Sequence, residues 1–250
     1  MYKTCNHLPR KPLPSINTAR QRGQSFLELA LIIPILLLML LGLVEVSFFI
    51  GRYLDIIDLT REAARFASVR DPFINAPISQ VSCSAGAPFN FYYHTACIFS
   101  PPTGSANCSD SKFCNGLNSF FTVDPAVDDV LITVYTVTNW QVSSPVFPQP
   151  TGYWALSNND SDTAHSDNWQ RDCQGNEVRT TPYFTPQQIN DTLNANSPKN
   201  KGLVAVEFYY CYHQVLNLPV VTNFIPNPLR IHAYTLMPIP AAKPSPTPRN

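Results

Sequence analysis

Hydrophobic residues are concentrated in one run near the N-terminus, from Phe26 to Ile50. As a helix, this run is about 37 Å long at ~1.5 Å per residue, which exceeds the ~30 Å hydrocarbon core of a bilayer. A buried helix of a soluble protein would carry a polar face, and this run carries none. Pro34 is tolerated in a membrane helix when neighbouring groups satisfy the freed carbonyl. The pattern therefore predicts a transmembrane helix.

A second helical pattern follows the apolar run directly. Small and apolar residues recur at helical spacing at Ile56, Leu59, Ala63 and Phe66, and at Ile57, Ala64 and Ala67. Two oppositely charged pairs, Asp58 with Arg61 and Glu62 with Arg65, are three residues apart and able to interact. Because Pro72 ends the pattern, we predict one continuous helix over residues 24–70.

Strand patterns occur only later in the chain. Three segments are β-branched or alternate between apolar and polar positions: residues 130–138, 203–213 and 230–237. The polar tracts between them, about 71–122 and 139–200, are either ordered by disulfides or partly disordered. We predict an α+β fold, in which a long N-terminal transmembrane and amphipathic helix precedes a small antiparallel sheet with long disulfide-bearing loops.

The charges are balanced in number but not in position. The chain has 17 basic and 17 acidic residues, and this balance argues against nucleic acid as a partner. Five basic residues and no acidic residue precede Gly23, so the N-terminus is expected in the cytoplasm and the chain after the helix outside. A cleaved signal peptide is the alternative, but its apolar region would be shorter and followed by a small-x-small site.

These patterns divide the chain into four parts. We expect a basic cytoplasmic leader over 1–23, the helix over 24–70, an extracytoplasmic domain over 71–237 and a Pro-rich tail over 238–250.

Cysteine usage supports an outer location for most of the chain. Apart from Cys5 in the leader, the cysteines number six: Cys83, Cys97, Cys108, Cys114, Cys173 and Cys211. An even number on the outer side predicts disulfides in an oxidising compartment. Short separations permit local Cys83–Cys97 and Cys108–Cys114 bonds without selecting them. Zinc binding is the alternative, but the chain has no CxxC pair and only His94 near the first cluster.

Two carboxylates, Glu28 and Glu45, interrupt the apolar run. An ionisable group near the bilayer centre costs at least ~2.5 kcal/mol, so its presence points to a function or to an interfacial position. We expect Glu45 to reach the outer interface, with Arg52 on the same helical face. Glu28 lies one turn into the helix near the cytoplasmic side, where it either reaches the headgroups or has a partner.

The residues RGQSFLE, from Arg22 to Glu28, stand directly before the apolar run and resemble a type IV pilin leader. More narrowly, residues 20–70 resemble the TadE/TadG-like minor pseudopilins of the tight-adherence (Tad/Flp, type IVb) pilus system. The shared features include Pro34 within the helix, Glu45 near its end and the following polar helix LTREAARFASV. In place of the tyrosine that many Flp-type pilins carry after the glutamate, this chain has Leu29.

The resemblance implies a processing site and a role for one carboxylate. A prepilin peptidase would cut between Gly23 and Gln24, which makes Glu28 the fifth residue of the mature chain. The free amine of Gln24, or that of a neighbouring subunit, would pair with Glu28 and set the register of assembly.

The implied function is that of a minor pilin-like subunit that initiates, primes or caps a tight-adherence pilus involved in adhesion. Its implied partners are major and minor pilin subunits, the assembly platform, the prepilin peptidase and membrane lipid. Its implied location is the cytoplasmic (inner) membrane, with incorporation into an extracellular pilus as a further step.

Motifs for chemistry are absent from the sequence. It contains no GxSxG, HExxH, P-loop or GxGxxG pattern, so we predict no enzyme activity, no cofactor and no metal site. The alternative function is an uncleaved, membrane-anchored ectodomain that binds a surface ligand. Its aromatic loops would contain Trp140, Trp154 and Trp169, although packing in the core is the simpler role for these side chains.

Overall fold

A computed structural model describes residues 18–239, except 106, 107, 109–111, 160–165, 195, 198 and 224. Most of the predicted leader (1–17) and nearly all of the predicted tail (240–250) lie outside the described residues. The chain divides after Val44 into two compact units, the first ending at Val44 and the second beginning at Glu45. Helix α1 (Thr18–Ser68) contributes residues to both units.

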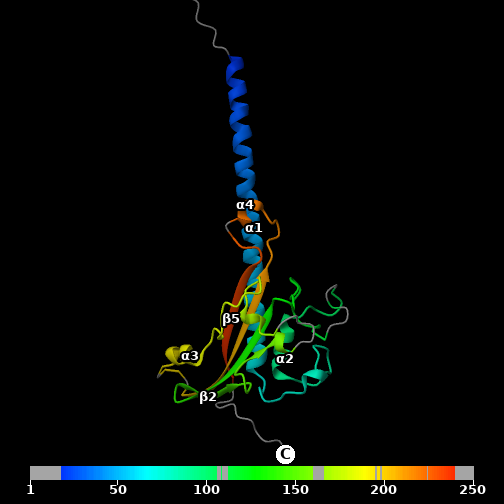
Figure 1. Cartoon of the computed structure of the whole chain (residues 1–250), viewed down its shortest axis with the longest axis vertical. Coiled ribbons are helices and arrows are strands. Elements are labelled where there is room, and N and C mark those ends of the chain that lie inside the picture. The colour runs from blue at the N-terminus through cyan, green and yellow to red at the C-terminus, as the bar shows by residue number, and fades with distance from the viewer. Residues whose placement is uncertain are drawn as a thin grey trace, which may run out of the picture. The chain divides into compact units, whose positions relative to one another are not determined.

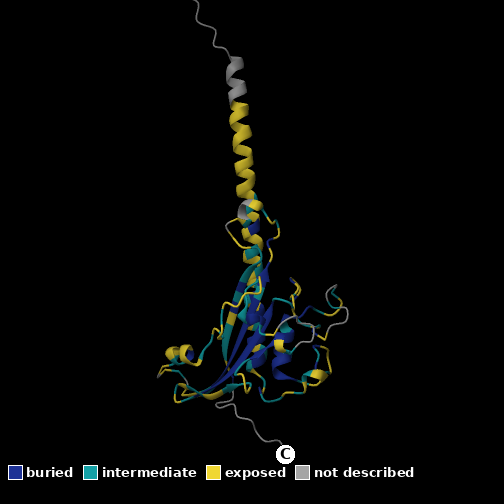
Figure 2. Cartoon of the chain, in the orientation of Figure 1, coloured by how far each residue is buried: buried dark blue, intermediate teal, exposed yellow. Residues whose placement is uncertain are grey.

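Among the described residues, the first unit consists of α1 up to Val44, most of which is apolar. Its large hydrophobic side chains are exposed, as Figure 2 shows in yellow, with exposed fractions of 66% at Leu31 and 65% at Met39. Pro34 is accommodated within the helix. By length and composition, α1 is sufficient to cross a membrane, which agrees with the helix predicted from the sequence.

In the second unit, α1 buries the face predicted from its periodicity. The side chains of this face that lie wholly in the core are Ile56, Ala63, Ala64 and Ala67. The predicted charged pairs lie on the exposed surface, with N–O distances of 3.3 Å for Arg61–Asp58 and 3.5 Å for Arg65–Glu62. Small residues on the buried face allow close approach of the sheet.

The sheet has five antiparallel strands in the order β2-β1-β4-β5, with β3 paired to β1 beyond the end of β2. The strands are β1 (Asp129–Thr138), β2 (Gln141–Phe147), β3 (Trp154–Ala155), β4 (Asn200–Tyr212) and β5 (Leu229–Ile239). The three predicted strands correspond to β1, β4 and β5, and the predicted fold class is confirmed. Figure 1 shows these strands running alongside α1.

Short helices occupy the connections. They are η1 (Ile78–Gln80), α2 (Phe91–Ala96), η2 (Cys97–Phe99), η3 (Leu156–Asn158), η4 (Asn168–Gln170), α3 (Pro186–Thr192) and α4 (Pro219–Thr222). All of them except α4 lie within the two long polar tracts.

Both faces of the sheet are covered, so the central strand β4 is buried on each side. Val206 and Phe208 share one core with α1 and α2. On the opposite face, Leu203 packs with Ile189, and Tyr209 packs with Trp169. Residues 166–193 of the long connection therefore contribute the second covering layer, although their sequence lacks a clear periodic pattern.

Strand β2 lies within the tract in which the sequence shows no strand. It is short, contains Pro145 and occupies an edge of the sheet, where proline is tolerated. The β1–β2 turn places Asn139 and Trp140 at φ values of 53° and 61°. Trp140 donates its backbone N–H to Lys199 and its indole N–H to Ser197, and these tertiary bonds hold the left-handed conformation.

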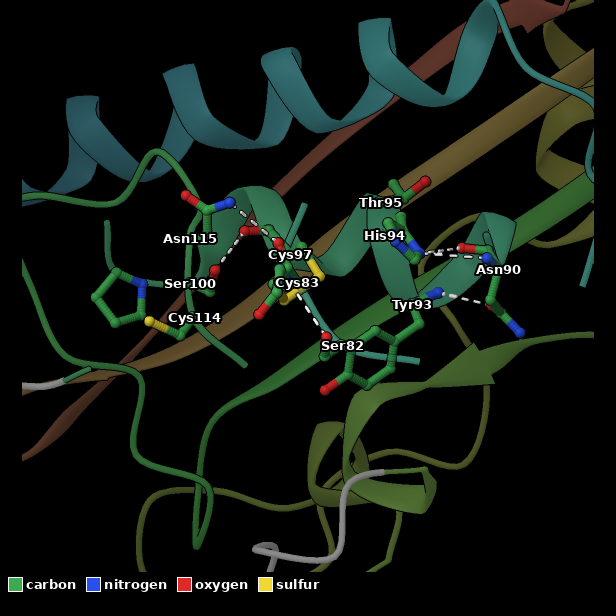
Figure 3. The surroundings of a disulfide bond; sticks show 12 residues. Ser82, Cys83, Asn90, Tyr93, His94, Thr95, Cys97, Ser100, Cys114 and Asn115 are labelled. Carbon is green, nitrogen blue, oxygen red and sulfur yellow. Dashed lines mark hydrogen bonds between the residues drawn. A yellow bond between two sulfur atoms is a disulfide. The ribbon is translucent and has the colours of Figure 1, made fainter. Parts of the chain in front are cut away.

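All six cysteines of the second unit are paired in disulfides. The pairs are Cys83–Cys97, Cys108–Cys114 and Cys173–Cys211. Figure 3 shows the first bond next to α2, whose N-cap residue Asn90 accepts from the backbone N–H of Tyr93 at 3.0 Å. The third bond ties the covering connection to β4 across a sequence separation of 38.

Replacing Phe208 tests the core between α1 and the sheet. Phe208 is fully buried, with its ring centroid 4.6 Å from that of Phe99. We expect Phe208→Ala to lower the free energy of unfolding by about 3 kcal/mol or more, because truncation leaves a cavity. Thermal unfolding in detergent, followed by tryptophan fluorescence, measures this because all three tryptophans lie in the second unit. Phe120→Ala, 59% exposed, is the control, and an equal effect of the two variants would contradict the packing.

Candidate functional site

The residues predicted to direct processing lie in the first part of α1. The helix includes both Gly23 and Gln24, and Glu28 follows one turn after Gln24. Glu28 is exposed on the helix surface between exposed Leu27 and Leu29. A carboxylate among apolar side chains is costly in lipid unless a polar or cationic group compensates its charge.

The second carboxylate of the apolar run, Glu45, is buried in the second unit with 5% exposure. Its Oε1 accepts the hydroxyl of Tyr212 at 3.0 Å and the backbone N–H of Val215 at 2.9 Å. Its Oε2 accepts the backbone N–H of Leu216 at 2.7 Å. Glu45 thus accepts a set of donors from β4 and the loop after it, which the sequence does not predict. Burial and the bond to Glu45 raise the pKa of Tyr212 to about 12.

A pair of buried aspartates begins at the N-terminal end of β1. Asp129 accepts the backbone N–H of Ser157 at 3.0 Å, the Ser157 hydroxyl at 2.7 Å and the backbone N–H of Trp169 at 3.0 Å. Asp128 accepts the backbone N–H groups of Asp124 and Cys211, both at 2.7 Å. The two carboxylates thus hold four separate segments of the chain at one edge of the core.

A partly buried arginine accompanies these aspartates. Arg230 on β5 donates to the carbonyl oxygens of Val127 at 2.6 Å and Asn168 at 2.8 Å. Burial raises the pKa of Asp128 to about 7 and that of Asp129 to about 6, although backbone hydrogen bonds and Arg230 act in the opposite direction. Burial lowers the pKa of Arg230, while the two aspartates oppose this change.

Glu207 on β4 also accepts backbone N–H groups from a connecting segment, on the face of the sheet opposite α1. It is 1% exposed and accepts the backbone N–H groups of Tyr183 at 3.1 Å and Phe184 at 3.2 Å. The Tyr209 hydroxyl donates to it at 2.5 Å, and His232 Nε2 lies 3.2 Å away. Burial alone would raise its pKa, but the hydrogen bonds, led by that of His232, outweigh burial and lower it.

Two tyrosines near Glu207 are partly exposed and stack on each other. Tyr183 and Tyr234 stack at 4.1 Å between ring centroids, with 39% and 45% exposure. In contrast, Trp154 and Trp169 are buried in the core. The tryptophans of the predicted aromatic loops are thus mainly packing residues.

The buried carboxylates share one chemical arrangement. Glu45, Asp128, Asp129 and Glu207 each accept at least two backbone N–H groups, most of them from loops. The sequence analysis missed these roles for Asp128, Asp129 and Glu207. The signal that would reveal them is an acidic residue within an otherwise apolar strand, as in DDVLITV and VAVEFYY. Within the part of the chain that the structure describes, no group of three or more metal-ligating side chains occurs.

The N-terminal segment matches a known protein family. Residues 23–65 match the family model described as TadE-like protein, which covers the Gly23–Gln24 peptide bond, Glu28, Glu45 and the beginning of the helical extension. No curated protein and no solved structure shows a significant match to the chain. The family match identifies a TadE-like segment and indicates a protein associated with the Tad pilus.

The raised aspartate pKa values predict a pH dependence of stability. In the unfolded chain, aspartates lose their protons near pH ~4, whereas in the folded protein Asp128 and Asp129 lose them at about 7 and about 6. Between these values the folded state binds more protons, so these groups contribute stability that is lost as pH rises. We expect Asp128→Asn to flatten the decline of Tm from pH 4 to pH 7, measured by thermal unfolding.

The amide that Asp128→Asn introduces keeps one oxygen able to accept the backbone N–H of Cys211, so the variant removes the titration and retains that bond. Asp191→Asn, at an exposed position on α3, is the control and should leave the slope of Tm against pH as in the wild type. Equal slopes for the wild type and Asp128→Asn would contradict the assignment.

Replacing Glu45 tests the bonds to the loop after β4. Glu45→Gln removes one of the two acceptor oxygens that serve Val215 and Leu216. Loss of an acceptor for a buried donor costs ~1–3 kcal/mol, so local opening, and cleavage of the loop by thermolysin, should rise by about tenfold. Mass spectrometry of the fragments measures this change. Glu62→Gln removes only an exposed ion pair and is the control, which thermolysin should cleave at the wild-type rate. Cleavage of Glu45→Gln at the wild-type rate would contradict a role of these bonds in holding the loop.

Proposed function

We propose that this chain is a minor pilin-like subunit of a tight-adherence pilus. It is inserted by α1 into the cytoplasmic membrane, cut after Gly23 and used to initiate, prime or cap the pilus. The observation that carries the proposal is the TadE-like match over residues 23–65, which includes both sides of the cleavage site and Glu28.

The membrane arrangement follows from the charge distribution and the helix. Basic residues before Gly23 keep the N-terminus in the cytoplasm, and the second unit, with its three disulfides, lies outside. In this proposal the leader comprises 1–23, the helix 24–70, the extracytoplasmic domain 71–237 and the tail 238–250. The partners are major and minor pilins, the assembly platform, the prepilin peptidase and membrane lipid.

Glu28 is the residue that we assign to assembly. After cleavage, Gln24 carries a free amine four residues before Glu28, on the same helical face. The carboxylate pairs with this amine or with that of a neighbouring subunit, because a cationic partner lowers the cost of a carboxylate in lipid. Pairing between subunits fixes the axial position of one helix against the next.

The second unit supports a binding or structural role more than a catalytic one. Its buried carboxylates are occupied by loop N–H groups and tyrosine hydroxyls, which leaves them poorly placed to act on a substrate. The exposed Tyr183–Tyr234 pair offers an aromatic surface for contact with a pilus partner or another cell surface.

The mass of the membrane-extracted protein tests processing. With a co-expressed Flp-type prepilin peptidase, we expect loss of residues 1–23, and Gly23→Val should prevent that loss. Without the peptidase, the chain should keep its full mass. An uncut chain under every condition would contradict the processed-pilin mechanism and favour a permanently anchored ectodomain that binds a surface ligand.

A further inference from the structure

The connection between β4 and β5, residues 213–228, has an unusual composition for an exposed loop. From Gln214 to Leu229 the sequence QVLNLPVVTNFIPNPL contains no acidic, basic or glycine residue. Surface connections between strands are usually polar and rich in turn-forming residues. In this loop, Val215 is 56% exposed and Ile225 is 44% exposed.

Several polar side chains of the 213–228 loop form hydrogen bonds within the loop. Gln214 donates its backbone N–H to the Asn227 side chain at 3.0 Å and its side-chain amide to the Ile225 carbonyl at 3.3 Å. Asn227 in turn donates to the side chain of Asn217 at 2.8 Å. These bonds connect the two ends of the loop, while its apolar residues Val215 and Ile225 remain exposed.

The loop is fixed beside the end of the apolar run of α1. The backbone N–H groups of Val215 and Leu216 bind Glu45 and hold the loop beside this residue. Glu45 is five positions before Ile50, where the apolar run ends. The short helix α4 belongs to this loop. At the same level, α1 exposes apolar side chains of its own, with exposed fractions of 52% at Val46, 47% at Phe48 and 49% at Ile50.

Interfacial residues accompany this level of the helix. Phe49 contacts Tyr212 at 5.4 Å between ring centroids, and Tyr53 is 40% exposed. Aromatic side chains of this kind concentrate at the boundary between lipid and water. Arg52, which directly precedes Tyr53, is a charged residue of the kind found on the polar side of such a boundary.

From these observations we infer that the 213–228 loop is a second membrane contact, which inserts Val215 and Ile225 into the outer lipid interface beside α1. The inference rests on the membrane insertion of α1 proposed above and adds a second attachment of the folded unit to the bilayer. It also accounts for Glu45, because the loop and Tyr212 supply three donors to a carboxylate that would otherwise meet lipid. The membrane is favoured over a protein partner because the loop continues the apolar surface of the spanning helix.

Tryptophan reporters in the full chain, reconstituted in phosphatidylcholine vesicles, test the inference. Val215→Trp and Val178→Trp place the reporter at two valines of equal exposure, 56% each, with Val178 as the control on the covering connection. Ile225→Trp is a second reporter on the loop. Leu36→Trp, in the apolar run, reports insertion of α1 itself. Wild-type emission is subtracted in each case.

Lipids brominated in their acyl chains should remove most of the added emission of Val215→Trp, Ile225→Trp and Leu36→Trp, and leave that of Val178→Trp unchanged. Quenching of Leu36→Trp without quenching of either loop reporter would overturn the loop contact while leaving the anchor intact. Absence of quenching at Leu36→Trp would overturn both the anchor and the loop contact. Loop emission that is blue-shifted only at high protein-to-lipid ratio, and not quenched by lipid, would assign the surface to a neighbouring subunit and overturn the inference.

Discussion

The second unit depends on buried carboxylates that accept backbone N–H groups from distant segments. Glu45 binds the 213–228 loop, Asp129 binds Ser157 and Trp169, and Glu207 binds Tyr183 and Phe184. A hydrogen bond to a charged group contributes ~1.5–3 kcal/mol, and a buried carboxylate without donors would be strongly destabilising. Each carboxylate therefore requires its loop, and each loop is ordered by its carboxylate. This mutual requirement explains how a chain with 24 prolines and 9 glycines orders long connections that have no regular periodicity.

Elements that follow from local sequence patterns could be predicted, whereas elements held by hydrogen bonds between distant residues could not. The helix and the strands β1, β4 and β5 follow from local patterns, because apolar runs and alternation reflect burial directly. Strand β2 and the covering connection are defined by tertiary contacts, such as the bonds of Trp140 to Ser197 and Lys199, which leave no periodic signal. For the site, the leader motif and the two carboxylates of the apolar run are visible in sequence. The partners of Glu45 are not, since Tyr212 and Val215 are more than 160 positions away.

The two carboxylates of the apolar run have contrasting surroundings. Glu28 is exposed on an apolar helix surface. Glu45 is buried and connects α1 to the sheet through Tyr212 at the end of β4. Glu28 is the residue that the proposed function assigns to pairing between subunits, while Glu45 links its part of the helix to the sheet. In the proposed pilus subunit, this division allows the helix to enter a filament while the sheet and its covering loops stay attached to it.

Hydrogen exchange of individual amides tests the central role of the carboxylates most directly. In the full chain, the account predicts slow exchange at Val215, Leu216, Trp169, Tyr183 and Phe184, whose N–H groups bind carboxylates although they lie outside the strands. Loop amides that do not donate to a carboxylate should exchange faster. Exchange of these five amides at the rate of the surrounding loop residues would contradict the account, because it would show that the buried carboxylates do not order the loops.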